Sequence, residues 1–418
     1  MPPRHFRRKG QINARLCLLV FPLAFLFCAF LAHTHKSGEL GSPIGKEAFY
    51  VVSLDGVRES NLNNVGRYEA YEQHARGVCG DHIKWIRQAG HVKAQRGAGL
   101  TTSFVEVIQH ADANNVEFAY IFEDDVVMLN PLFCSSRFRH EMWLQVPQHF
   151  VLILAGHAVE ASGPAIETSL FAFRNITKHY GSYAWCIKRE NFGILLDLWN
   201  LQLRDNKGML SPDVDLSRNF RELYHTSESY LLQFPQIFHH PAGYSNTWFK
   251  QRTDVLDKQR LSLIVKLSTS SKTWKYIEEY FTKDELIAEL TLLIEPGLTT
   301  YLRESKKATT KVFVRRMSTD SDLNDEFNAA IFNSGEPILV FISSHELPSI
   351  ADLFNIRERH FQSPYSILHY DQWPLKKIPQ VYSARKWTEQ IYVHGITVTS
   401  RVCAIQARRN MHHCEEFA

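Results

Sequence analysis

Three adjacent acidic residues, Glu123, Asp124 and Asp125, have the composition of a cation-binding site. They follow the apolar run 118–122 and precede a second apolar run, 126–128. Neighbouring like charges repel each other, and they are tolerated best where solvent or a cation offsets the repulsion. A hard divalent cation prefers carboxylate oxygens and commonly keeps water and substrate phosphates as its other ligands. A solvated turn is the alternative interpretation, but the flanking apolar runs favour a metal-dependent site.

Buried strands and amphipathic helices alternate between about residues 47 and 254, which predicts an α/β domain. The strands are short, continuous apolar runs, whereas the helices repeat apolar residues on one face. Strands that alternate with helices favour a mainly parallel, Rossmann-type sheet covered on both faces. Ligands bind beyond the carboxyl ends of such strands, where the acidic triplet is expected. We expect strands at 49–54, 118–122, 150–154 and 183–187, and helices at 101–115 and 192–199.

The pattern changes after about residue 255 and predicts a smaller C-terminal α/β unit at 255–418. No chemical motif distinguishes this unit, so the sequence leaves its role open. The expected elements are a helix at 273–293, a strand at 311–314, an acidic loop at 320–326, a strand at 337–342 and a helix at 350–360.

The N-terminal segment has the pattern of a transmembrane helix that serves as a signal anchor. A basic tail, residues 1–15, precedes an uninterrupted apolar run at 16–32 and a polar stem at 33–46. The run is close to the shortest helix that crosses a bilayer. Basic residues before it favour a cytosolic N-terminus and a lumenal remainder. A cleaved signal peptide and a buried helix are the alternatives.

Composition narrows the class of protein. The chain has 47 basic and 44 acidic residues, so it lacks the excess of positive charge that is typical of nucleic-acid binders. In an oxidising lumen, the five cysteines after the apolar run permit two disulfides and one free thiol, and the sequence leaves their pairing open. These five are Cys79, Cys134, Cys186, Cys403 and Cys414.

Six short segments follow one another between residues 49 and 250: 51–55 with Arg58, 99–103, 120–126, 154–156, 180–187 and 211–215. Together they resemble, in the same order, the motifs of the family 25 glycosyltransferases. This family contains bacterial lipooligosaccharide galactosyltransferases and animal collagen galactosyltransferases. Ser53 and Phe104 depart from the family pattern, which has Asn and His at these two positions.

The resemblance implies a nucleotide-sugar-binding fold of the GT-A type, an inverting mechanism and a UDP-sugar donor. Glu123 and Asp125 then match the ends of a D-x-D motif, and alternate side chains of an extended segment project to the same side. One is expected to meet the nucleotide sugar, and the other a Mn²⁺ or similar divalent ion that stabilises the departing diphosphate. The expected donor contacts are Asp55, Arg58, Ser103, Glu123 and Asp124, and the expected metal ligands are Asp125, Glu123 and His240.

Inversion requires a base that takes the proton of the acceptor hydroxyl. Asp215 is the preferred candidate and Asp213 the second, because both lie far from the acidic triplet in the sequence. The segment Ser211-Pro212-Asp213 is equally typical of a turn or a helix cap.

These features predict a type II membrane glycosyltransferase of the Golgi or endoplasmic reticulum, with its catalytic domain in the lumen. We expect it to move a hexose, galactose or glucose, from a UDP-sugar to a hydroxyl of a protein or glycan acceptor. Two alternatives stay open. One is a nucleotidyl or phosphosugar transferase on a similar sheet, and the other is a non-catalytic adhesion or scaffold protein on a degenerate transferase fold.

Overall fold

The computed structural model describes most of the chain beyond residue 44. The described ranges are 45–55, 66–93, 97–147, 152–155, 159–179, 183–205, 212–213, 229–240, 243–245, 250–252, 259–267, 275–295, 310–316, 322–343, 347–371, 379–383, 385–387, 395–409, 411 and 413–416. No helix within these ranges is long and apolar enough to cross a bilayer. The expected cytosolic tail and membrane anchor, residues 1–32, lie outside them.

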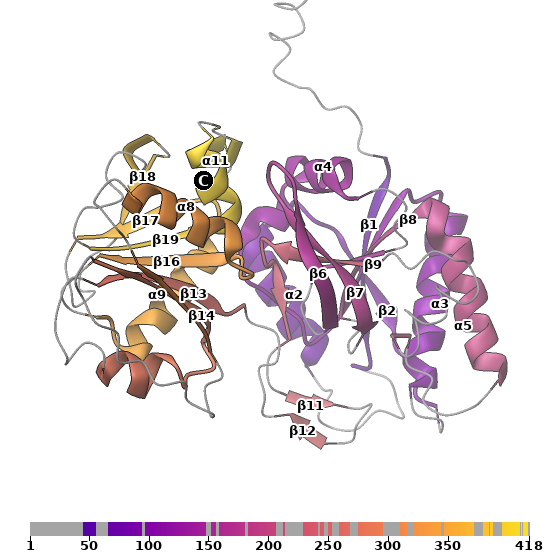
Figure 1. The fold of residues 1–418 in the computed structure, drawn as a ribbon. Helices are drawn as coiled ribbons and strands as arrows, with labels where there is room; N and C mark the ends of the chain where they lie inside the picture. The colour runs from indigo at the N-terminus through magenta and orange to yellow at the C-terminus, as the bar shows by residue number, and fades with distance from the viewer. Residues whose placement is uncertain are drawn as a thin grey trace, which may run out of the picture. The chain divides into compact units, whose positions relative to one another are not determined.

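Eight strands form the first sheet: β1 (Glu47–Ser53), β2 (Trp85–Ala89), β3 (Phe118–Glu123), β5 (Leu152–Leu154), β6 (Val159–Glu167), β7 (Ala172–His179), β8 (Ala184–Lys188) and β9 (Ser229–Phe234). Figure 1 shows this sheet, and its strand order is β2-β1-β3-β8-β5-β9-β7-β6. β1 runs parallel to β2 and β3, and β5 runs parallel to β9. β8 is antiparallel to both β3 and β5, and β7 is antiparallel to both β6 and β9.

The expectation of a mainly parallel sheet is therefore wrong, because the sheet is mixed. The prediction assumed that a helix connects each strand to the next, which is how parallel neighbours are usually joined. The described residues between β5 and β8 form the β6–β7 hairpin instead of a helix. The expected strands themselves are confirmed, since β1, β3, β5 and β8 cover them to within a few residues.

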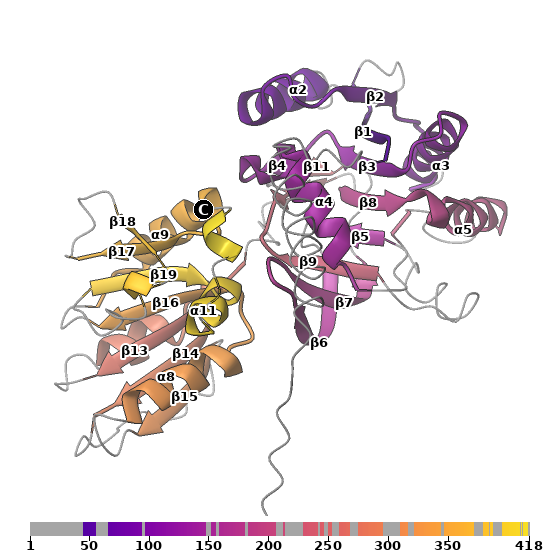
Figure 2. The same ribbon diagram turned by 90° about the horizontal axis from the view of Figure 1, so that it is seen from above.

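Side chains alternate between the two faces of the first sheet. On one face, Tyr50, Ile121 and Trp185 are buried in a core with apolar residues of α3 (Ala98–Ala113) and α5 (Phe192–Asp205). Figure 2 shows these two helices side by side along the sheet. On the other face, aromatic rings dominate, and those of Phe49 and Tyr120 stack at 4.7 Å. Because both faces are covered, the central strands are continuous apolar runs in the sequence. The remaining elements of this half are α2 (Arg67–Cys79), β4 (Val127–Met128), η2 (Pro131–Cys134), α4 (Ser136–Gln145), η3 (Arg189–Asn191), β10 (Phe238–His239), β11 (Gly243–Ser245) and β12 (Lys250–Arg252).

Phe104 packs where the family pattern has a histidine. It lies on α3, is fully buried, and its ring centroid is 5.1 Å from that of Trp185 and 5.7 Å from that of Trp199. Both neighbouring rings belong to the core between the sheet and the two helices. This departure from the family pattern therefore completes a hydrophobic core, and Phe104 takes no part in a polar site.

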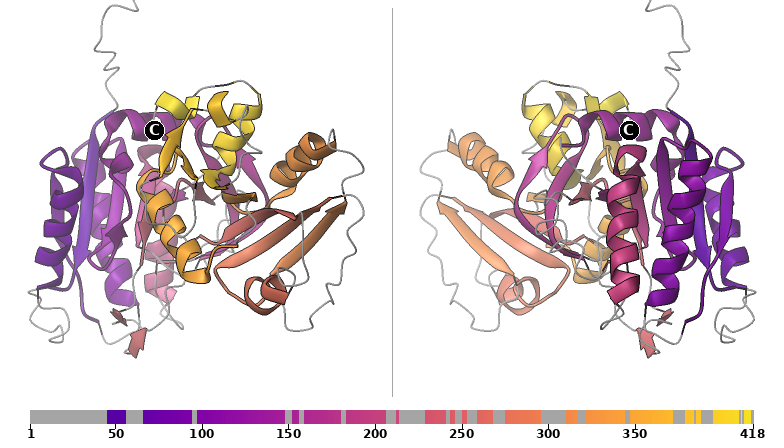
Figure 3. Two further views of the ribbon diagram at one scale, coloured as in Figure 1. Left: turned by 90° about the vertical axis from the view of Figure 1, so that its left-hand side faces the viewer. Right: turned by 90° about the vertical axis from the view of Figure 1, so that its right-hand side faces the viewer.

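Seven strands form the second sheet, in the order β15-β14-β13-β16-β19-β17-β18. They are β13 (Leu261–Leu267), β14 (Ile287–Ile294), β15 (Lys311–Arg316), β16 (Ile338–Ser343), β17 (Ile367–Tyr370), β18 (Gln380–Tyr382) and β19 (Gly395–Ser400). Side chains of η4 (Ile277–Phe281) and α9 (Ile350–Gln362) bury one face, and those of α8 (Asp322–Asn333) and α11 (Arg401–Arg408) bury the other. Figure 3 shows these helices against the sheet. The second sheet is thus an α/β layer with a core of its own.

Two predictions for this half are wrong in part. The expected helix at 273–293 is helical only in its first part, at η4, whereas residues 287–293 belong to strand β14, all of whose residues are buried. A short apolar run that is buried on both sides of a sheet cannot be told from a buried helix by periodicity alone. The expected acidic loop at 320–326 belongs from Asp322 onward to α8. The expected strands at 311–314 and 337–342 and the helix at 350–360 are confirmed as β15, β16 and α9.

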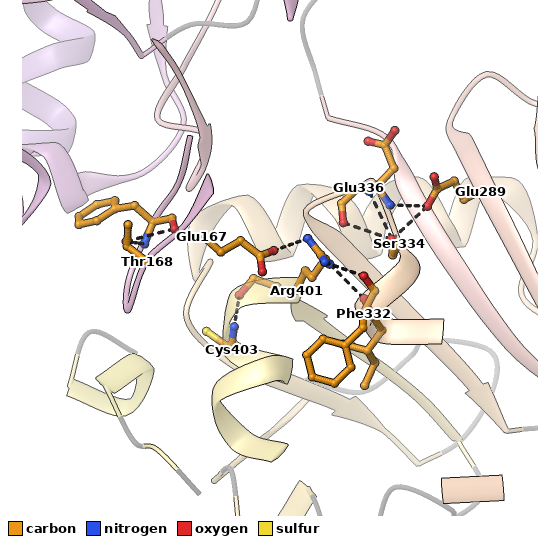
Figure 4. Close-up of polar contacts among 12 residues, drawn as sticks. Glu167, Thr168, Glu289, Phe332, Ser334, Glu336, Arg401 and Cys403 are labelled. Carbon is orange, nitrogen blue, oxygen red and sulfur yellow. Dashed lines mark hydrogen bonds and ion pairs between the residues drawn. The ribbon is translucent and has the colours of Figure 1, made fainter. Parts of the chain in front are cut away.

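Polar contacts join the β6–β7 hairpin to the elements of the second sheet. Arg401, the first residue of α11, forms an ion pair with Glu167 at the end of β6. The Arg401 guanidinium also donates to the carbonyl of Phe332 at 2.8 Å, so it lies between the two groups (Figure 4). The hydroxyl of Tyr365 donates to the carbonyl of Leu170 at 2.9 Å. The hydrogen bond between Tyr365 and Leu170 is buried, so it satisfies polar groups that would otherwise lack a partner.

Close packing at the start of α3 explains the glycine of the 99–103 segment. A Cβ atom at Gly99 would lie 1.9 Å from the carbonyl oxygen of His91. We expect Gly99→Ala to lower the free energy of unfolding by about 1–3 kcal/mol, because the backbone must move apart. Gly77→Ala is the matched control, since Gly77 is exposed within α2 with nothing within 4 Å of its added Cβ. That change is expected to stabilise the protein by about 0.5–1 kcal/mol. Urea denaturation followed by tryptophan fluorescence measures both, and equal midpoints for the two variants would contradict the close approach.

Candidate functional site

The strand order of the first sheet reverses at β1. The chain passes from β1 to β2 on one side, and then returns to place β3 on the other side. In open α/β sheets, ligands bind in the crevice beyond the carboxyl ends of the strands at such a reversal. β1 and β3 end there at the same level, because Val52 is paired with Glu123. The residues that follow these strands, Leu54-Asp55 and Asp124-Asp125, therefore lie at the favoured place for a ligand.

Asp124 and Asp125 form a turn, not an extended segment. The amide of Val126 donates to the carbonyl of Glu123 at 3.3 Å, which closes the turn directly after β3. The expected extended backbone from Glu123 to Asp125 is therefore wrong, whereas a metal shared by these two residues stays a prediction. The neighbouring carboxylates of Asp124 and Asp125 share a partner instead, and we call them the acid pair.

That partner is Arg67, which the sequence prediction missed. Its Nη2 lies 2.7 Å from Oδ1 of Asp124 and 2.8 Å from Oδ2 of Asp125. Burial lowers the pKa of Arg67, but the attraction of Asp125, Asp124 and Glu123 outweighs burial and raises it. Arg67 is the first residue of α2, where a positive charge opposes the helix dipole. That opposition is the signal in the sequence that could have pointed to a function for this residue.

Two anchors fix α2 against the chain beyond the acid pair. A disulfide joins Cys79, the last residue of α2, to Cys134 in η2. In the middle of the helix, the ring nitrogen Nε2 of His74 lies 3.2 Å from the amide nitrogen of Met128 in β4. The position of the Arg67 backbone is therefore tied to the segment that carries the acid pair.

His240 reaches the acid pair from a distant part of the chain. β10 pairs antiparallel with β4, which sets His239 opposite Val127 and brings His240 close to Asp125. Nε2 of His240 lies 2.9 Å from Oδ2 of Asp125, and the His240 ring lies against that of Tyr183 with centroids 5.4 Å apart. The sequence prediction grouped Asp125 with His240, and the structure brings these two together.

Asp125 has one crowded oxygen and one isolated oxygen. Oδ2 contacts both Arg67 and His240, whereas the buried Oδ1 has no hydrogen-bond partner in the described part of the chain. Burial alone would raise the pKa of Asp125, but His240 and Arg67 outweigh it and hold the pKa well below its ordinary value. Asp125 is therefore a carboxylate at neutral pH, with one oxygen available to a further cation.

Asp124 is the more deeply buried member of the acid pair, with 6% of its side chain exposed. The hydroxyl of Ser53, at the end of β1, donates to its Oδ2 at 2.5 Å. Burial raises the pKa of Asp124 to about 6, despite the opposing attraction of Arg67. Ser53, where the family pattern has Asn, thus supplies a hydrogen bond to the acid pair.

The other expected donor contacts have different outcomes. Asp55 lies two residues beyond the end of β1, and its Oδ2 accepts a hydrogen bond from the amide of Tyr68 at 3.2 Å, which supports the start of α2. Ser103 is fully buried, its hydroxyl donates to the carbonyl of Gly99, and it accepts from the amide of His91. The expectation that Ser103 contacts a donor is therefore not supported, because its hydroxyl holds the backbone together. Arg58 lies outside the described residues.

The two candidate bases stay predictions. Asp213 is buried, and the neighbouring carbonyl of Pro212 accepts a hydrogen bond from the indole of Trp199 at 3.1 Å. This contact ties the segment to α5. Asp215 lies outside the described residues.

The described residues contain no group of three or more His, Cys, Asp or Glu side chains arranged around a common metal position. Asp125 and His240 are close enough to share an ion, and Glu123 lies near enough to Arg67 for its charge to raise the pKa of that residue. A metal at this site would therefore need ligands from a substrate or from water, which is common for Mg²⁺-type ions.

Glycosyltransferases are among the solved structures with which this α/β fold aligns. A glycosyltransferase involved in glycosylation of the major capsid of PBCV-1 is 10% identical, with a TM-score of 0.27 over 44% of this chain and 81% of that chain. Drosophila β1,4-galactosyltransferase 7, in a complex with manganese, UDP-Gal and xylobiose, is 12% identical, with a TM-score of 0.25 over 50% of this chain and 75% of that chain. A mannose-1-phosphate geranyltransferase from Thermus thermophilus is 8% identical, with a TM-score of 0.30 over 75% and 98%.

Comparisons of sequence give no match. No family model matches the chain, family 25 included, and no curated protein sequence matches it. The TM-scores of the structural neighbours are too low to carry a functional argument. The chemistry of the site therefore rests on its own geometry.

The raised pKa of Asp124 predicts a pH dependence of stability. The Asp124 carboxyl binds a proton more readily in the folded chain than in the unfolded chain. Asp124 therefore lowers the free energy of unfolding as the pH rises from about 4 to about 6. Asp124→Asn mimics the protonated form. In the absence of metal, we expect the variant to gain about 2–4 °C in unfolding temperature over the natural chain at pH 7.5, and little at pH 4. Scanning fluorimetry across this range measures the difference. The exposed Asp112 provides the control through Asp112→Asn, and an advantage of Asp124→Asn that is constant with pH would contradict the assignment.

Proposed function

We propose that this chain is a glycosyltransferase that moves a hexose, galactose or glucose, from a UDP-sugar to a hydroxyl of a protein or glycan. One observation carries the proposal: the acid pair lies beyond β1 and β3, where the strand order reverses, and Oδ1 of Asp125 is buried without a partner among the described residues. The diphosphate of a nucleotide sugar, joined to a divalent cation, has the charge and oxygen ligands that suit this place.

The residues at the site fit a divalent cation such as Mn²⁺. Asp125 and His240 would hold it, with Glu123 as the third predicted ligand, and the isolated Oδ1 of Asp125 supports this assignment. A bound ion would act as a Lewis acid on the departing diphosphate. Asp124 and Asp55 then lie on the donor side, where they add negative charge that favours a cation. Arg67 supplies a positive charge that is suited to phosphate oxygens.

Transfer with inversion needs one more group, a base on the acceptor side. Asp215 remains our candidate, with Asp213 as the second, and the burial of Asp213 beside Trp199 supports a fixed position for this segment. The base would take the proton of the acceptor hydroxyl as its oxygen attacks the anomeric carbon. We propose the second sheet, which has a core of its own, as an acceptor-binding module.

A lumenal location agrees with the cysteine chemistry. Cys79 pairs with Cys134 and Cys403 pairs with Cys414, and Cys186 is a buried free thiol. Disulfides persist in oxidising compartments such as the lumen of the secretory pathway. The proposal therefore includes the Golgi or endoplasmic reticulum, with membrane attachment through residues 16–32.

Asp125→Asn provides the test of the proposed activity. We expect the natural protein to release UDP from UDP-galactose or UDP-glucose with MnCl₂ and not with EDTA, and the variant to lose roughly 100-fold or more of this rate. Asp112→Asn is the matched control, because Asp112 pairs with Arg189 on the exposed surface. A coupled assay for UDP measures the rate, and unfolding curves check that each variant is folded.

Three results would count against the proposal. Full UDP release by folded Asp125→Asn would remove Asp125 from the site. Release of pyrophosphate in place of UDP would favour a nucleotidyl transferase. Failure of the folded protein to bind any UDP-sugar in calorimetry would favour a non-catalytic protein.

A further inference from the structure

Arg67 occupies the position between two carboxylates where a cation would be expected. A single nitrogen, Nη2, lies within 2.8 Å of an oxygen from each member of the acid pair. Arg67 has 21% of its side chain exposed, and Asp124 has 6%. The contact is therefore largely removed from water, and it is much stronger than an ion pair on the surface.

The same contact leaves the acid pair incompletely satisfied. Oδ2 of Asp125 already meets both Arg67 and His240, while Oδ1 is buried without a partner among the described residues. A buried carboxylate oxygen without a partner is unusual in a folded protein. A cation with several coordination positions would engage it, which one guanidinium nitrogen does not.

We infer that Arg67 is a resident counter-cation, which a divalent cation displaces from the acid pair and which then binds the diphosphate of the donor. This inference rests on the proposed function. No covalent bond is made or broken in the exchange. The carboxylates exchange the guanidinium for the metal ion as their partner, and the guanidinium then binds phosphate oxygens. Arginine suits the second role because its planar donors match phosphate in a bidentate manner.

The anchoring of α2 makes this exchange a movement of the side chain. The Cys79–Cys134 disulfide holds the end of α2, and His74 lies against β4 near its middle. Arg67 begins this helix, directly after Gly66, whose φ of 78° is a left-handed conformation. Because the backbone is fixed close to the acid pair, the long side chain stays within reach of a ligand bound at the acid pair.

The exchange has a consequence for binding. Without UDP, the positive charge of Arg67 competes with a metal ion for the same oxygens, so Mn²⁺ alone binds weakly. With UDP present, Arg67 gains a new partner and leaves the carboxylates to the ion. Mn²⁺ and UDP therefore each strengthen the binding of the other, and this coupling is reciprocal.

The test measures Mn²⁺ binding directly, by the electron paramagnetic resonance signal of the free ion, with and without UDP. We expect Arg67→Gln to bind Mn²⁺ alone about tenfold more tightly than the natural protein, and to lose about tenfold of the coupling with UDP. Arg67→Lys keeps the charge and is expected to bind Mn²⁺ alone nearly as weakly as the natural protein. Arg76→Gln is the matched control, because Arg76 lies on the same helix, is exposed, and pairs with Glu72.

The possible outcomes separate this inference from the proposed function. Unchanged Mn²⁺ affinity in folded Arg67→Gln overturns the inference, while UDP release that Asp125→Asn abolishes would leave the proposed function in place. If Arg67→Gln does not fold, the natural protein decides: equal Mn²⁺ affinity with and without UDP overturns the inference. Absence of Mn²⁺ binding under every condition, together with absence of UDP release, overturns both.

Discussion

Two carboxylates on adjacent residues of a turn repel each other, and the rest of the site is arranged around the repulsion between Asp124 and Asp125. Burial makes the repulsion stronger, because the surroundings screen charge less than water does. The pKa values of the two residues move in opposite directions: burial raises that of Asp124, whereas His240 and Arg67 hold that of Asp125 low despite its burial. The pair is stable only because neighbouring elements bring positive charge and hydrogen-bond donors to it.

Three separate parts of the chain supply those partners. The end of β1 provides the hydroxyl of Ser53, the start of α2 provides Arg67, and the segment after β10 provides His240. The parallel pairing of β1 with β3 sets the first contact, and the pairing of β4 with β10 sets the third. The fold thus has a direct electrostatic role, because the strands and the helix place each of these partners next to the acid pair.

The sequence predicted part of this arrangement. The apolar runs around residues 118–122 and the three following acids located the end of β3, and His240 was grouped with Asp125. Arg67 was missed because no motif or spacing in the sequence joins it to the acid pair, which lies far along the chain. Only the fold brings the start of α2 next to the acid pair. Ser103 was misassigned because a motif match reports a position, whereas the hydroxyl's partners, Gly99 and His91, depend on how α3 packs.

The same limit applies to the fold. The strand β14 was predicted as part of a helix because an apolar run that is buried on both faces of a sheet has no distinguishing periodicity. Apolar runs also do not show whether neighbouring strands of the first sheet are parallel or antiparallel. Direction and pairing are set by contacts between distant segments, as in the β6–β7 hairpin. Local pattern therefore identified six of the fifteen strands in the two described sheets, but not which strands are neighbours.

A site built for a doubly charged ion must also be stable before the ion arrives. Without a counter-cation, the acid pair would oppose folding in the absence of ligand, since buried like charges are costly. Arg67 offsets part of that cost by holding both carboxylates, and Oδ1 of Asp125 remains the one oxygen that it leaves unpaired among the described residues. The arginine therefore meets two requirements on the same residues. It permits the chain to fold around the acids, and it leaves Oδ1 of Asp125, unpaired among the described residues, for a metal ion with more coordination positions. That difference in coordination is what makes the acid pair suitable for a ligand.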